Sequence, residues 1–244
     1  MMMKTFFLLM FFPFLCLADM DASRLILNKI DNFCIPYRDF LIQTKITSYE
    51  HGKVKETAVF DAYISGPDKS LVIARQYKTR DMKILYVDEK MWVHLPQTHR
   101  PIRITPIQRL MGEASNGDVA RVGFGEDYSA ELAGTEMIQG VPCRKILLIA
   151  KKPSATYHRI LLFVREIDYR PVKADFHLLS GKHFKTAYYE SFRPVGNKQI
   201  LEKMTIYDAL RNWKKTTFEY VKIEEKRIPV KYFNKNYLIH VGGL

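Results

Sequence analysis

The chain has few cysteines and none of the common motifs of a catalytic or metal site. Only three cysteines occur in 244 residues, and one of them, Cys16, falls in the apolar segment at the start. There is no Gly-x-Ser-x-Gly, no His-Glu-x-x-His and no Cys-x-x-Cys motif. These absences argue against the common serine hydrolases, zinc peptidases and dithiol enzymes. We therefore expect no catalytic residue, no metal and no cofactor.

Long hydrophobic runs are also missing after the first eighteen residues. The chain opens with a basic residue, Lys4, followed by an apolar stretch and a small residue, Ala18, of the kind that precedes a signal-peptide cleavage site. This stretch of about 14 residues is shorter than the roughly 20 that a membrane-spanning helix needs. Leu15 is not the small residue that lipid modification of Cys16 would require. We predict a secretory signal peptide over residues 1–18, cleaved after Ala18, and a single domain over 19–244.

Negative charge is scarce relative to positive charge. The sequence has 38 Lys and Arg against 26 Asp and Glu, which gives a formal net charge of +12. Such a balance favours anionic partners, either phospholipid headgroups or nucleic acid, although a solvated basic surface would have the same composition. Because the chain is expected to be exported, we predict no nucleic-acid partner.

Two cysteines remain outside the predicted leader, Cys34 and Cys143. In an oxidising compartment they could form one disulfide. Alternatively, they are two buried free thiols that behave as small apolar residues. The sequence alone leaves both possibilities open.

The start of the predicted mature chain has the pattern of one amphipathic helix. Asp21 or Ser23 provides an N-cap, and an apolar stripe at helical spacing continues through Ile30 and Phe33. Pro36 ends the pattern. This helix must bury its apolar face against another part of the molecule.

From residue 37 the hydrophobic period changes to two, which is typical of strands. Residues 106–124 lose this alternation and gain glycines, so we expect a loop with one or two short helical turns. Residues 226–244 resemble an irregular tail with one short β segment. So many short strands joined by tight turns predict a mainly β fold, a curled antiparallel sheet forming an incompletely closed barrel with an N-terminal helix and a short helical lid. The predicted strands cover residues 37–47, 57–64, 71–75, 82–87, 91–95, 102–105, 127–133, 144–150, 158–165, 172–179, 183–189, 200–207 and 216–223.

Three features around residues 91–112 stand out. Trp92, beside a strand-ending proline, either lines an apolar cavity or is an ordinary core residue. Arg103 and Arg109 lie close to Arg100 in sequence and could receive a phosphate or carboxylate, or could lie on a solvated strand face. Met111 precedes a glycine, which indicates either a lid edge or a simple turn.

These features, taken in order, resemble one known family. The segments Met91-Trp-Val-His-Leu-Pro96, Pro101-Ile-Arg-Ile104 and Arg109-Leu-Met-Gly112 are similar to the central signature of the outer-membrane lipoprotein-sorting proteins, the LolA-like group. The resemblance continues through residues 126–128, 140–143, 169–173, 180–182 and 185–186. One segment departs from it, because residues 113–121 replace the Ser-Asp-Phe-Ser-Tyr-Glu-Asp run that usually follows Met-Gly in this group.

The resemblance implies a periplasmic carrier whose half-open barrel encloses the acyl chains of a lipoprotein or lipid. It also implies an inner-membrane transporter or exporter as a partner. The headgroup is expected near Arg103 or Arg109, and the residues expected to line the lipid cavity are Phe40, Ile42, Phe60, Trp92, Leu95 and Met111.

Two other functions are compatible with the same sheet. An enzyme acting on a hydrophobic small molecule would need polar groups that converge inside the cavity, and His94 with Tyr86 or Glu131 are the candidates. An accessory binding module of a membrane exporter would form a persistent complex with a membrane protein instead of binding lipid.

Overall fold

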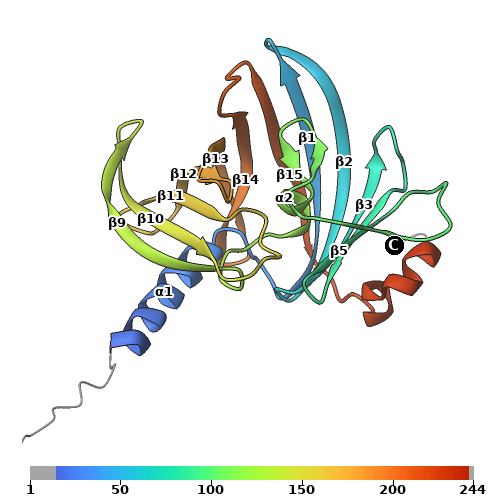
Figure 1. The fold of residues 1–244 in the computed structure, drawn as a ribbon, viewed down its shortest axis with the longest axis horizontal. Coiled ribbons are helices and arrows are strands. Elements are labelled where there is room, and N and C mark those ends of the chain that lie inside the picture. Colours follow the sequence, from blue (N-terminus) through green and yellow to red (C-terminus); the bar gives the residue numbers. More distant parts are fainter. Residues whose placement is uncertain (1–14, 242–244) are drawn as a thin grey trace, which may run out of the picture.

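The computed structural model describes residues 15–241, with side chains from Ala22 onward, and most of the chain forms one antiparallel sheet. The sheet has thirteen strands in the order β6-β5-β4-β3-β2-β1-β15-β14-β13-β12-β11-β10-β9. It curls around a concave face, and its edge strands β6 and β9 do not pair with each other (Figure 1). The predicted fold class, a mainly β half-barrel, is therefore confirmed.

The strands follow the ranges that the alternation predicted, with one small addition inside the lid. The two-stranded sheet β7-β8 and the helix α2 (Asn116–Ala120) come between β6 and β9. The strand bounds are β1 (Asp39–Glu50), β2 (Lys53–Ser65), β3 (Lys69–Gln76), β4 (Lys83–Val87), β5 (Lys90–His94), β6 (Ile102–Ile104), β7 (Arg109–Met111), β8 (Ala114–Ser115), β9 (Tyr128–Ile138), β10 (Val141–Ala150), β11 (Arg159–Arg165), β12 (Pro171–His177), β13 (His183–Val195), β14 (Lys198–Asp208) and β15 (Lys214–Glu225).

The central strand β1 shows why both faces of the sheet are apolar. Its neighbours are β2 and β15, so it joins strands β2–β6 on one side to strands β9–β15 on the other. Successive residues of a strand point to opposite faces. Phe40 and Ile42 belong to the core on the concave face, whereas Leu41 between them belongs to a second core on the outer face. Both faces of this strand are therefore covered.

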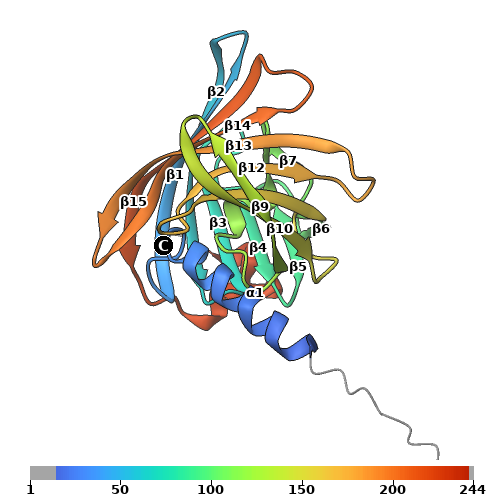
Figure 2. The ribbon, with the colours of Figure 1, turned by 90° about the vertical axis from the view of Figure 1, so that its left-hand side faces the viewer.

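The inner core fills the concave face and is covered by two helical elements. The helix α1 (Leu15–Asp31) crosses one end of the sheet beside β9 and contributes Leu27 and Ile30 (Figure 2). The lid, defined here as residues 106–127, lies within the concavity and contributes Val119 and Ala120 of α2. Two covering elements of this kind were expected from the sequence.

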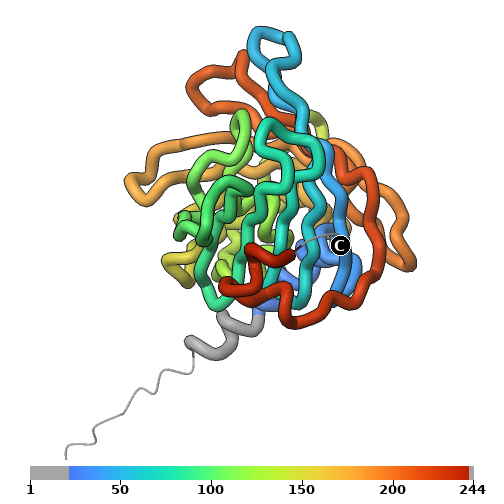
Figure 3. The backbone as a smooth tube through the Cα atoms, turned by 90° about the vertical axis from the view of Figure 1, so that its right-hand side faces the viewer, coloured from blue at the N-terminus to red at the C-terminus, as the bar shows by residue number. Residues whose placement is uncertain are grey.

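The outer core lies between strands β3–β5 and the C-terminal tail. The tail forms two 3₁₀ helices, η1 (Val230–Phe233) and η2 (Lys235–His240), where we expected a short β segment (Figure 3). Pro229 lacks the N–H that a strand ladder needs, and the Asn234 side chain accepts a hydrogen bond from the Asn236 amide at 2.8 Å. The buried residues of the outer core are Leu41, Tyr63, Leu71, Ile73, Leu85, Ile228, Phe233, Leu238 and Val241.

The helix α1 begins earlier than the predicted cap. It starts at Leu15 and runs through Ser23, whose hydroxyl accepts a hydrogen bond from the Ala130 amide at 2.7 Å on β9. Within residues 15–241 no helix has the length and apolar character required to cross a bilayer. The predicted leader, residues 1–18, and its cleavage site at Ala18 lie outside the part whose side chains are described, so they stay predictions.

Candidate functional site

The lid contains a glycine that lies directly on the sheet. Gly112 has φ +52°, in the left-handed region that favours glycine. A Cβ at this position would approach the Cβ of Ser48 to 2.6 Å and would also meet the Thr216 side chain. The next amide, that of Glu113, donates to Thr216 Oγ1 at 2.8 Å. The lid is thus fixed against β1 and β15 at residues 112 and 113.

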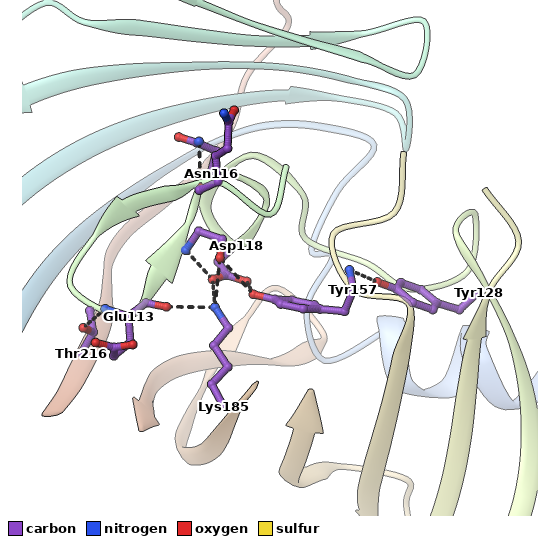
Figure 4. A network of polar contacts seen from close by, with 9 residues as sticks. Glu113, Asn116, Asp118, Tyr128, Tyr157, Lys185 and Thr216 are labelled. Atoms are coloured by element: carbon purple, nitrogen blue, oxygen red, sulfur yellow. Dashed lines mark hydrogen bonds and ion pairs between the residues drawn. The ribbon is translucent and has the colours of Figure 1, made fainter. Parts of the chain in front are cut away.

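A buried lysine holds the next part of the lid. Lys185 of β13 is fully buried, and its Nζ donates to Asp118 Oδ2 at 2.7 Å, to the Glu113 carbonyl oxygen at 2.9 Å and to Ser115 Oγ at 3.2 Å (Figure 4). Burial lowers the pKa of Lys185, and the carboxylate of Asp118 opposes this shift. The three donors of the ammonium are all used, so the ion pair joins α2 to the sheet.

Two tyrosines extend this network toward the edge strand β9. The Tyr157 hydroxyl donates to Asp118 Oδ1 at 2.7 Å, and the Tyr157 amide donates to the Tyr128 hydroxyl oxygen at 3.2 Å (Figure 4). Burial and the neighbouring Asp118 carboxylate raise the pKa of Tyr157, and burial raises that of Tyr128. Both hydroxyls therefore stay protonated at neutral pH.

The end of the lid is held by α1. Asp31, the last residue of α1, accepts hydrogen bonds from the amides of Phe124 at 2.8 Å and Gly125 at 2.9 Å. Burial raises the pKa of Asp31 to about 6, although the two amides lower it. The carboxylate thus satisfies two backbone donors that lie away from regular structure.

Arg121 and Asp127 form a second buried ion pair, at the end of the lid. The Arg121 guanidinium also lies 4.3 Å from the ring centroid of Tyr86, and its Nη1 donates to the Ser154 carbonyl oxygen at 3.0 Å. Burial raises the pKa of Asp127, and the guanidinium opposes the shift. These contacts fix the position of residues 121–127 between two parts of the interior.

Two cavities lie on either side of this segment. The tyrosine cavity has a volume of about 100 Å³ and is lined by tyrosines 128, 157, 189 and 220 together with apolar side chains of the sheet. The loop cavity has a volume of about 190 Å³ and lies between Ile35, Ile64, Tyr86 and residues 120–123 and 125–127. The residues that line both are Arg121, Val122, Gly123 and Asp127.

Five of the six residues predicted to line a cavity belong to the concave side. Phe40, Phe60 and Met111 are buried in the inner core, and Leu95 packs against it. Ile42 lies directly on the wall of the tyrosine cavity. These five residues therefore share the concave side, and their role in lining a lipid cavity stays a prediction.

The prediction for Trp92 is wrong. Its side chain packs in the outer core, where the Lys235 ammonium lies 4.6 Å from its ring centroid. The Arg103 guanidinium lies 5.5 Å from the centroid of the same ring, so it lies on the outer face as well. Arg109 is exposed on β7, apart from both cavities. Alternation along β5 turns Trp92 away from the concave face, because its neighbour Met91 is the residue buried in the inner core.

The polar groups that an enzyme would have used do not converge. The His94 ring lies on the same side of β5 as Trp92 and its Nε2 lies 3.0 Å from the Thr98 carbonyl oxygen. Tyr86 is buried in the inner core, and Glu131 is exposed on the edge strand β9. His94 and Tyr86 thus belong to opposite faces of the sheet.

The disulfide between Cys34 and Cys143 is not formed, because both thiols are free. Cys34 follows α1 and lines the tyrosine cavity. Cys143 is buried on β10 with Ile138 and Phe163, in a small cluster separate from the inner core. The two cysteines thus lie in different parts of the molecule.

Sequence reasoning missed the ion pairs and the tyrosines. Asp118 and Arg121 fall in residues 113–121, the segment that departs from the family pattern, so no motif marked them. Lys185 belongs to a predicted strand, and its alternation with Ala187 and Tyr189 places it on the inner face. That pattern was a usable signal for a buried cation.

The fold, the lid and the interior cavities define a class of protein, the LolA-like half-barrels. The crystal structure of a LolA superfamily protein from Nitrosomonas europaea is similar to this chain with a TM-score of 0.82 and 29% sequence identity, covering 88% of this chain and 98% of that one. The predicted resemblance to the LolA-like group is therefore confirmed. A search of curated proteins gives no match.

A family model described as "-like: Uncharacterized protein" matches residues 66–240, and the chain belongs to this family. Two further crystal structures share the fold. A DUF1329 family protein from Desulfovibrio piger has a TM-score of 0.74 and 20% identity, with coverage of 90% of this chain and 99% of that one. An outer membrane lipoprotein-sorting protein domain from Vibrio parahaemolyticus has a TM-score of 0.73 and 17% identity, with coverage of 91% and 98%.

Proposed function

We propose that the chain is an exported periplasmic carrier that encloses acyl chains of a lipoprotein or lipid and moves them toward the outer membrane. The observation that carries this proposal is the pair of cavities between the inner face of the sheet and the lid. Their walls are mainly apolar, and residues 121–127 are the partition between them. The fold that the chain shares with a LolA superfamily protein supports the same conclusion.

Loading requires the lid to move. An apolar cavity of about 150 Å³ accommodates one benzene molecule, so cavities of about 100 and 190 Å³ are too small for a long acyl chain. Displacement of residues 121–127 would join them. The ion pairs of Arg121 and Lys185 and the hydrogen bonds of Asp31 close the lid when no acyl chain is bound.

A partner must drive the exchange. Burial contributes about 0.8 kcal/mol per methylene, so a chain of about 16 carbons gains roughly 12 kcal/mol relative to water. A bilayer offers the same gain, which makes transfer from the membrane to the carrier nearly neutral. An inner-membrane transporter or exporter therefore loads the carrier in this proposal.

Native mass spectrometry of the protein isolated from a periplasmic extract tests the proposal directly. We expect mass increments of an acyl lipid or an acylated protein.

Dye binding provides a second test. We expect the delipidated protein to bind diphenylhexatriene, a hydrocarbon dye that fluoresces in apolar surroundings. Met204→Trp places a larger side chain on the wall of the tyrosine cavity and should weaken dye binding, whereas Met137→Trp on the exposed face of β9 should not. A protein without co-purified lipid that also fails to bind the dye would contradict the proposal, and a persistent complex with a membrane protein in place of lipid would favour the accessory module.

A further inference from the structure

Two of the tyrosines that line the tyrosine cavity have hydroxyls without a hydrogen-bond partner among the described residues. Tyr189 of β13 and Tyr220 of β15 line this cavity beside the Cys34 thiol. Among the residues that the structure describes, no hydrogen bond joins either hydroxyl to another group. The other two tyrosines of the cavity differ, because the hydroxyls of Tyr128 and Tyr157 both belong to the network around Asp118.

The side chains of Tyr189 and Tyr220 are half-buried, so their hydroxyls lose part of their contact with water and gain no hydrogen bond in the protein. Phenylalanine would fill the same space with the same ring and would avoid this loss. Burial also raises the pKa of Tyr189 and of Tyr220, so both hydroxyls stay protonated and can donate. Two such donors on residues that line one cavity are thus suited to an acceptor on a ligand.

The charges around the cavity determine which kind of acceptor fits. Arg121 is the single cation among the described residues of the wall, and it is already paired with Asp127. Asp118 also lies on the wall and is neutralised by Lys185. An anionic acceptor would be buried beside two carboxylates without a free cation, which is strongly unfavourable. An uncharged oxygen meets no such penalty.

We propose that the hydroxyls of Tyr189 and Tyr220 donate hydrogen bonds to an uncharged carbonyl oxygen of the cargo, the ester or amide that joins an acyl chain to its head. This inference rests on the proposed carrier function and adds a subsite to it. The cargo is then recognised by its acyl linkage as well as by its hydrocarbon. The chain itself lies against apolar residues of the same wall, such as Ile42, Leu201 and Ile206.

A matched pair of uncharged ligands tests the subsite. 1-Palmitoylglycerol and 1-O-hexadecylglycerol have the same head and the same chain length, and only the first has a carbonyl. Each ligand is titrated against diphenylhexatriene bound to the delipidated protein. Because two hydrogen bonds to the carbonyl are gained, we expect the ester to bind about tenfold more tightly than the ether.

Variants separate the hydroxyls from the rings. Tyr189→Phe with Tyr220→Phe should abolish the preference for the ester, because both hydroxyls are removed and both rings are kept. The control is Tyr188→Phe with Tyr207→Phe, two rings that pack against each other at 5.8 Å and alternate with inward-facing residues of β13 and β14. This control should keep the tenfold preference.

The outcomes distinguish the subsite from the carrier function. Equal binding of ester and ether by the unmodified protein, or a preference that survives in the variant lacking both inner hydroxyls, overturns the subsite and leaves the carrier function standing. Failure of the dye and of both ligands to bind overturns the carrier function and the subsite together.

Discussion

Lys185 is the residue on which the position of the lid depends most directly. A buried charge is tolerated only when it is paired and its hydrogen bonds are satisfied, and Lys185 meets both conditions through Asp118, Ser115 and the Glu113 carbonyl. A hydrophobic side chain of similar size would fill the space at lower cost. The ion pair therefore contributes a defined position for α2 more than it contributes stability.

Removing one partner of this pair should be more harmful than removing both. We expect Lys185→Met to lower the free energy of unfolding by about 3–5 kcal/mol, because it leaves the Asp118 carboxylate buried without a cation. Lys185→Met combined with Asp118→Asn should lose less than the single variant, because no unpaired charge remains. Urea denaturation measures both. Losses in the double variant equal to the sum of the two single losses would contradict this account of the pair.

At the scale of elements, the strands and the presence of a helical lid could be predicted, but the contacts that hold the lid could not. Each strand of the large sheet overlaps a range of alternating apolar and polar residues. The alternation arises because successive side chains of a strand point to opposite faces of the sheet. The lid has no such period, and its structure depends on contacts distant in sequence, such as those of Gly112 with Ser48 and of Asp118 with Lys185. These contacts exist only once the sheet has curled.

The same limit explains the error at Trp92. Alternation shows that Trp92 and Met91 face opposite sides, but it does not show which side is concave. That choice depends on which covering element packs where, and the tail residues Phe233 and Leu238 cover the outer face. Because β5 has apolar side chains on both faces, the sequence alone does not show which face is concave.

The contact between α1 and the lid should depend on pH. Burial raises the pKa of Asp31 to about 6, above the ordinary aspartate value of 3.8, so protonation of this group favours the folded state. Its contribution is fully present below the ordinary value and is lost as the pH rises through about 6. The melting temperature of the unmodified protein relative to Asp31→Asn should therefore increase by a few degrees between about pH 7.5 and about pH 4.5. A difference that is constant across this range, measured by scanning calorimetry, would show that Asp31 does not titrate as described.

The partition between the cavities gives a second prediction for an element. Arg121→Met combined with Asp127→Asn removes the ion pair without leaving a buried charge alone. The segment 121–127 then loses a constraint, and we expect diphenylhexatriene to bind more tightly and to associate faster, as measured by stopped-flow fluorescence. Asp208→Asn with Arg211→Met removes another local ion pair, in the turn after β14, and serves as the control. An equal change in both variants would indicate a general loss of stability in place of an opened partition.

The described part of the chain is built around one large sheet with a main core on each face. The inner core contains the cavities and the lid, and the outer core is closed by the tail. Under the proposed carrier function, the inner face binds the ligand and the outer face supplies apolar burial that a bound ligand does not disturb. This division predicts that stability and binding can be changed independently.

Matched truncations on the two faces test this division. Leu238→Ala in the outer core and Met204→Ala on the wall of the tyrosine cavity each remove a large buried side chain, and each should cost about 2–5 kcal/mol of stability. Only Met204→Ala enlarges a space that the dye can enter, so only this variant should change the dissociation constant of diphenylhexatriene. Thermal denaturation and dye titration of both variants provide the comparison. If Leu238→Ala changed dye binding as much as Met204→Ala did, the sheet would not separate the two cores, and the tail would have to be counted as part of the binding site.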